Sequence, residues 1–106
     1  MVKIKNYKEH LLKQLQDSEK AAEYLNAALH DDDPHAFLLA LRDIAEAQGG
    51  MGWLAKQSTL NRENLYRTLS IRGNPRFFNL LAVLDAFGLE LSIQARPRKR
   101  QKQARV

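Results

Sequence analysis

The stretch GGMGWLAKQSTLNRENLYRTL, residues 49–69, decides the fold of this chain. Two glycines precede a short helical segment at 51–57, a break at 58–60 and a second helical segment at 61–69 that opens with Asn61, a favoured N-cap residue. A helix-turn-helix needs a small residue where its helices cross and apolar residues that lock the crossing angle. Most of these needs are met by Leu54, Ala55, Leu60, Leu65 and Leu69. The pattern predicts a helix-turn-helix over 51–69, with 61–69 as its recognition helix.

The second segment carries side chains that can read DNA. When Leu65 and Leu69 face inward, the 100° step of a helix turns the polar residues outward. These candidate base readers are Arg62, Glu63, Asn64, Tyr66 and Arg67. Arginine can bond guanine twice, asparagine can bond adenine, and tyrosine can contact a phosphate or a thymine methyl group. The alternative is an ordinary solvated face on a core helix.

The loop after this segment adds candidates for phosphate contact. Arg72-Gly73-Asn74-Pro75 has the composition of a loop, and Arg76 follows it directly. We expect Arg72, Asn74 and Arg76 to contact the DNA backbone, which positions a protein without specifying sequence.

Helix signals continue outward from this unit in both directions. Asn6 with Glu9 resembles a capping box, Asp17 or Ser18 can cap a second helix, and Asp33-Pro34 begins a third. Gly49-Gly50 ends that third helix. On the other side, the apolar run 77–87 predicts a central core helix that ends at Gly88.

The segment Leu89-Glu90-Leu91-Ser92-Ile93-Gln94 alternates apolar and polar residues, as a half-buried strand does. A strand needs a partner, either the stretch 2–4 or the same strand of a second subunit, and we favour the second subunit and hence a homodimer. The predicted class is all-α: a helix-turn-helix bundle with extra N-terminal helices and a short C-terminal strand. It comprises one domain over 1–95 and a disordered basic tail over 96–106.

Composition narrows the functional classes. The chain has 106 residues, enough for one core, and no cysteine, which excludes disulfides and thiolate metal sites. We find no apolar run long enough for a membrane helix and no signal peptide at the N-terminus, so we expect a cytoplasmic protein without membrane contact.

The net charge of +5 is unevenly distributed. No acid follows Ala95, where the bases are Arg96, Arg98, Lys99, Arg100, Lys102 and Arg105. The part up to Gln48 instead has nine acids against six bases. This polarity suggests that the C-terminal half meets a polyanion, while the acidic half meets solvent or a basic partner. For the tail, nucleic-acid contact and an inert role remain equally open.

Other polar clusters have simpler explanations. The cluster His30, Asp31, Asp32, Asp33 and His35 could suggest a metal site, but a helix boundary at Asp33-Pro34 accounts for it. Ser58 and Thr59 near Lys56 lack an orienting third group, so they do not indicate a nucleophile. We expect no enzyme activity, no cofactor and no metal. Trp53 is expected to pack against the acidic N-terminal helices rather than to stack on a base.

The chain also resembles a known family between about Tyr7 and Ser92. The stretch 52–69, Gly73-Asn74-Pro75, Phe87-Gly88-Leu89 and the Asp33-Pro34 helix look like the HigA-like addiction-module antidotes. The resemblance implies an Xre-type, lambda-repressor-like fold, repression of its own operon, and neutralisation of a RelE/ParE-superfamily toxin that acts on translating messenger RNA. It implies base contacts at Asn61, Arg62, Glu63 and Arg67, and Tyr66 matches a frequent family tyrosine.

Two positions depart from the family motif. Its first position, often a glutamine that touches phosphate, is Met51, and its turn glycine is replaced by Thr59. A β-branched residue is uncomfortable at positive φ, so either the turn differs or it holds strain.

The segment 51–69 by itself indicates only DNA binding, and the antitoxin role is what the resemblance implies, supported by the acidic first half. Three functions are therefore open. The first is an antitoxin and autorepressor whose dimer binds palindromic operator DNA. The second is a phage-type regulator without a toxin partner. The third is an interaction module that has lost DNA binding, which Glu63 beside Arg62 keeps open.

Overall fold

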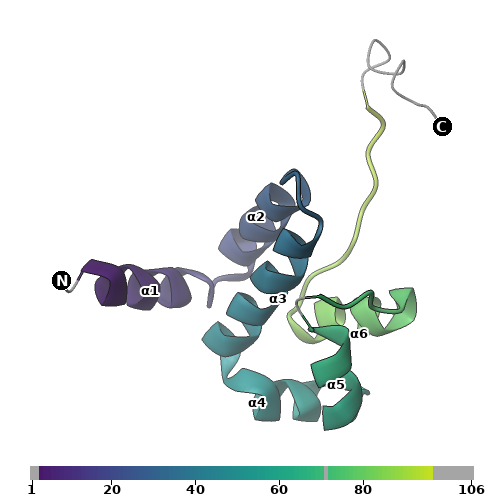
Figure 1. Cartoon of the computed structure of the whole chain (residues 1–106). Coiled ribbons are helices and arrows are strands. Elements are labelled where there is room, and N and C mark those ends of the chain that lie inside the picture. Colours follow the sequence, from purple (N-terminus) through teal and green to yellow (C-terminus); the bar gives the residue numbers. More distant parts are fainter. Residues whose placement is uncertain (1–2, 71, 97–106) are drawn as a thin grey trace.

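The computed structural model describes residues 3–70 and 72–96, and in this part of the chain the regular elements are all helices. They are α1 (Lys3–Gln14), α2 (Ser18–Leu29), α3 (His35–Gln48), α4 (Gly50–Gln57), α5 (Arg62–Thr68) and α6 (Phe77–Ala86). Figure 1 shows α3 at the centre, with α2 beside its upper half, α4 below it, and α1 projecting to one side. None of the described helices is long and apolar enough to cross a membrane. The expected all-helical class is confirmed for the described residues.

Asp17 caps α2 and Asn61 caps α5 as predicted, whereas α3 begins one residue later than predicted, at His35, with Pro34 rather than Asp33 as its N-cap. Asp17 accepts a hydrogen bond of 2.9 Å from the amide of Glu19, and Asp33 accepts one of 2.9 Å from the amide of His35. The cap predicted at Asn6 is wrong, because α1 already begins at Lys3. The residues before Asn6 are compatible with a helix, so α1 starts a turn earlier without that cap.

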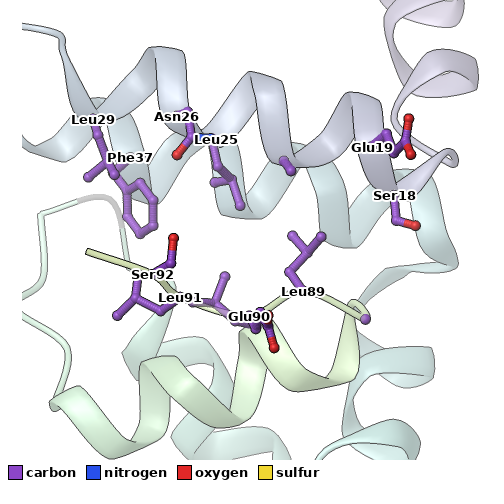
Figure 2. A pocket seen from close by; sticks show the side chains of 13 residues that line it. Ser18, Glu19, Leu25, Asn26, Leu29, Phe37, Leu89, Glu90, Leu91 and Ser92 are labelled. Carbon is purple, nitrogen blue, oxygen red and sulfur yellow. The ribbon is translucent and has the colours of Figure 1, made fainter. Parts of the chain in front are cut away.

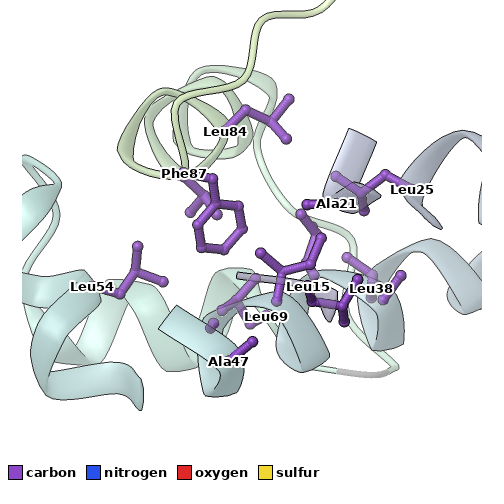
Figure 3. Close-up of a cluster of buried hydrophobic side chains, with 14 of the residues drawn as sticks. Leu15, Ala21, Leu25, Leu38, Ala47, Leu54, Leu69, Leu84 and Phe87 are labelled. Carbon is purple, nitrogen blue, oxygen red and sulfur yellow. The ribbon is translucent and has the colours of Figure 1, made fainter. Parts of the chain in front are cut away.

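The core is built around α3 rather than α6. The buried residues of α3 are Leu38, Ala40, Leu41, Ile44, Ala45 and Ala47. Contacts from α1, α2 and α4 cover α3 on several sides, and the cluster that results is drawn in Figure 3. The prediction of 77–87 as the central helix is wrong: Phe77 and Phe78 are 56% and 79% exposed, because the start of α6 is not covered by the bundle.

The predicted strand over Leu89–Gln94 does not form in the described residues. Leu89 donates a backbone hydrogen bond to Leu84, and the segment then runs on as extended chain without strand pairing. Lys3 and Ile4, which could have paired with it, lie in helix α1. Alternation alone cannot make a strand, because an unpaired extended segment leaves its backbone groups to water. Residues 97–106, most of the predicted tail, lie outside the described part.

Trp53 packs on Phe87, the residue that caps the C-terminal end of α6. Its ring stacks on Phe87, with centroids 6.4 Å apart and planes inclined by 8°. The prediction that Trp53 packs in the protein is therefore confirmed, and the aromatic partner of its ring, Phe87, was not predicted. The stacking holds α4 against the end of α6, although α5 and the loop after it lie between the two helices in sequence.

The turn between α3 and α4 depends on Gly49, whose φ is 138°. A Cβ atom added there would lie 2.8 Å from the Cβ of Trp53, whereas a Cβ added to Gly50, at φ 91°, would meet nothing within 4 Å. Both glycines therefore have a positive φ, but only Gly50 has room for an added Cβ atom. This difference offers a matched pair of variants.

Gly49→Ala is expected to lower the free energy of unfolding by about 2–4 kcal/mol, because left-handed strain and overpacking against Trp53 add. Gly50→Ala is expected to cost only the strain, about 1–2 kcal/mol. Urea denaturation of both variants measures the difference. Equal losses would mean that contact with Trp53 does not restrict residue 49.

A polar contact joins α2 to α3. The Tyr24 hydroxyl donates a hydrogen bond of 2.6 Å to Asp43 Oδ2 in a half-buried position. Burial raises the pKa of Tyr24 above the usual 10.0, and the hydrogen bond to Asp43 raises it further. The folded chain thus holds the phenolic proton more tightly than the unfolded chain does.

Tyr24→Phe is expected to cost about 1 kcal/mol of stability at neutral pH through loss of this hydrogen bond. Since the folded-state pKa is raised, the stabilisation is fully present below the ordinary value of 10.0 and is lost as the pH rises toward the folded-state value. Wild type should therefore lose more stability than Tyr24→Phe above that pH in denaturation experiments. Tyr66→Phe, at a residue 51% exposed, is the control and should follow wild type.

Candidate nucleic-acid interface

The α4–α5 unit lies at the lower end of the molecule in Figure 1. Helix α4 contacts α5 across a turn of residues 58–61. Leu54 of α4 and Leu65 of α5 are fully buried, at 0% exposure, and anchor both helices in the same core. The two helical segments and the break predicted at 51–69 are therefore found at the predicted places, to within a residue or two.

Side-chain hydrogen bonds within the unit form its turn. Ser58 Oγ accepts a bond of 3.2 Å from the amide of Leu60, and Asn61 Oδ1 accepts one of 2.8 Å from the amide of Asn64. Among the described residues, only glycines have positive φ, so Thr59 is not strained. The turn thus differs from the glycine-containing form that the family motif usually has.

The predicted base readers divide by exposure. Arg62, Glu63, Tyr66 and Arg67 are exposed, and we call these four residues the outer face of α5. Asn64 is half-buried and its backbone carbonyl accepts a bond of 2.7 Å from the hydroxyl of Thr68, while Asn61 caps the helix. Five of the predicted readers, from Arg62 to Arg67, therefore lie on α5, and Asn61 also has a structural role.

Two residues of the outer face form an ion pair. Arg67 Nη2 lies 3.2 Å from Glu63 Oε2, and the two side chains are 71% and 78% exposed. A pair this exposed contributes only about 0.3–0.5 kcal/mol. Opening it to release the guanidinium for another acceptor therefore costs little.

Polar side chains from α5, the loop and α6 surround a hollow of about 460 Å³. Its lining residues are Asn64, Arg67, Thr68, Ser70, Gly73, Asn74, Pro75, Arg76 and Asn79. The predicted phosphate contacts Asn74 and Arg76 thus lie beside Arg67. Arg72 does not line the hollow; its charge instead helps to lower the pKa of Asp33, after the larger effect of the hydrogen bonds from His35.

Sequence reasoning missed a residue that holds α5 in place. Arg42 of α3 donates a hydrogen bond of 3.0 Å from Nη1 to the carbonyl of Leu69, at the C-terminal end of α5. Carbonyls at a helix end lack partners inside the helix, and a cation there also favours the helix dipole. The contact spans 27 positions in sequence, so no local pattern could reveal it.

Met51 and the acidic cluster have structural roles. Met51, where the family motif often has a phosphate-binding glutamine, is half-buried and packs against the core.

In the acidic cluster, Asp33 Oδ1 accepts a hydrogen bond from the His35 amide and lies 3.1 Å from His35 Nδ1, as a residue at a helix start does. Within the described ranges, no three potential metal ligands lie together.

Comparison with known proteins points to one family. The family described as "Probable addiction module antidote protein" matches residues 4–95. An uncharacterized protein of Haemophilus influenzae is 38% identical over 80 residues, which cover 76% of this chain and 81% of that protein. No solved structure matches the chain.

Proposed function

Because this chain belongs to the family of probable addiction module antidotes, we propose that it is the antitoxin of a type II toxin-antitoxin module and represses its own operon. An antidote acts by binding its toxin, so the chain is not an enzyme. We propose further that the toxin is RelE/ParE-like and that the antitoxin is of the HigA-like, lambda-repressor-like kind. It would act in the cytoplasm, where operator DNA lies.

The observation that carries the DNA-binding part is the outer face of α5. Leu65 holds the helix in the core while Arg62, Tyr66 and Arg67 are left exposed, as a recognition helix requires. Arg67, Asn74 and Arg76 around one hollow supply donors for DNA phosphates next to that face. A homodimer of such units would place two recognition helices on a palindromic operator.

The experiment has two arms. Purified chain is footprinted on its own promoter, and growth is measured in cells that express the toxin of the same operon with or without the chain. A protected palindrome and restored growth support the proposal. Restored growth without a footprint favours a toxin-binding module that has lost DNA binding. The negative charge of Glu63 on the outer face of α5 supports this alternative. A footprint without rescue favours a phage-type regulator.

A further inference from the structure

A groove lies between α2 and the extended segment that follows α6. Its volume is about 390 Å³, and it is lined by residues of α2, Phe37 of α3, Leu84 of α6 and the segment 88–92. Figure 2 shows Leu25 and Leu29 of α2 on one wall and Leu89 and Leu91 on the other. We call this feature the α2 groove.

The side chains that line the α2 groove are mainly apolar, and some of them are open to solvent. Leu25 is buried, but Leu29 and Leu91 are 56% and 44% exposed. Ile93, just beyond the groove, is 92% exposed. Contiguous exposed apolar side chains of this kind mark binding surfaces more often than isolated ones do.

The charged residues that line the groove are all acidic. Glu19 lines it from α2 and Glu90 from the opposite wall, and no basic residue lines it. Both carboxylates are exposed, on a chain whose net charge is +5. The complementary occupant is a segment with apolar side chains and at least one lysine or arginine.

Two occupants from this chain fit less well. In a two-fold contact of the groove with itself, Glu19 and Glu90 would face the same acids of the second copy. Residues 97–106 are basic, but their apolar residues are small, Ala104 and Val106, and could not fill a floor formed by leucines and Phe37.

We propose that the α2 groove is the docking site for a basic amphipathic segment of the toxin, an inference that rests on the antitoxin function proposed above. Helix α2 lies in the upper part of Figure 1 and α5 lies at its lower end, and no residue of the outer face of α5 lines the groove. We therefore expect toxin and operator DNA to bind the same chain at the same time.

The test uses the purified toxin of the same operon and titration calorimetry. Leu29→Lys and Glu90→Lys are expected to weaken toxin binding by about 30-fold or more, as at a binding hot spot. The matched controls are Leu39→Lys, at an exposed leucine of α3, and Glu9→Lys on α1, both outside the groove. The controls should stay within about threefold of wild type. Circular dichroism and operator footprinting confirm that each variant is folded.

Crosslinking keeps the proposal falsifiable if a groove variant fails to fold. Since the chain has no cysteine, Ser92→Cys carries a single photoreactive label in the groove, and Glu9→Cys carries one on α1. A product of chain plus toxin from position 92 alone supports the docking site. A product of two chains, or one within the chain, overturns it.

The remaining outcomes are equally decisive. Groove variants that bind toxin as wild type does overturn the inference but leave the antitoxin function intact. A wild-type chain that does not bind the toxin overturns the proposed function, and the docking site with it. Loss of the operator footprint on addition of toxin would contradict simultaneous binding.

Discussion

Replacing Arg67 with alanine is expected to weaken the specific operator footprint and to leave the helical circular-dichroism spectrum unchanged. The guanidinium lies on the outer face of α5, 71% exposed, and its ion pair with Glu63 is its one salt bridge within the described residues. A bidentate arginine contact with guanine contributes about 1–3 kcal/mol of discrimination, so specific affinity should fall about 5- to 150-fold. Helix α5 loses no buried contact.

Glu63→Ala is the matched control for this prediction. It removes the same ion pair of 3.2 Å but keeps the guanidinium and takes away a negative charge that opposes phosphate. Operator binding should therefore stay equal or tighten, as measured by fluorescence anisotropy at fixed salt. An intact Arg67→Ala footprint would contradict the assignment of α5 as the recognition helix. Equal losses in both variants would assign the effect to the ion pair instead.

The sequence revealed features that depend on neighbouring residues. Asp17 and Asn61 cap helices through hydrogen bonds that span two and three positions, and Gly49 has the positive φ that its place after α3 demands. Such caps and turns are set by backbone groups within one helical turn, so the identity of a few residues predicts them. The exposed residues of α5 followed in the same way from the 100° helical step once Leu65 was placed inward.

Features that join distant segments could not be predicted. Trp53 and Phe87 stack across 34 positions, and the pattern of either helix alone says only that each aromatic residue is buried somewhere. The apolar start of α6 gave the wrong centre for the core, because exposure depends on how many helices cover a surface. The alternation at 89–94 failed for a related reason: a strand requires a partner, and the described residues of the chain place none beside it.

In the candidate site, too, local features could be predicted from the sequence and long-range contacts could not. Its residues on α5 were predicted, but the 27-position contact from Arg42 that holds the end of this helix was not. The grouping of Asn74 and Arg76 with Arg67, without Arg72, depends on the path of the loop and not on its composition. Helical period and capping therefore predict the position and the exposed face of α5, while the contacts that hold this helix in place come from tertiary packing.

Leu65→Ala is expected to be the most destabilising of the substitutions considered for α5. Leu65 is fully buried, at 0% exposure, and joins the core that Leu54 and Leu69 share. Deleting a buried leucine side chain costs about 2–5 kcal/mol, because transfer energy and a residual cavity add. For a domain of this size the melting temperature should fall by roughly 10–30 °C.

The neighbouring residue separates stability from recognition. Tyr66 is 51% exposed, so Tyr66→Ala should change the free energy of unfolding by no more than about 0.5 kcal/mol. Because Tyr66 lies on the outer face of α5, the same variant should weaken operator binding, whereas Leu65→Ala should lose binding only in proportion to its unfolded fraction. Thermal denaturation and footprinting at a temperature where both variants are folded measure the two effects. A Leu65→Ala chain as stable as wild type would show that α5 is not anchored in the core.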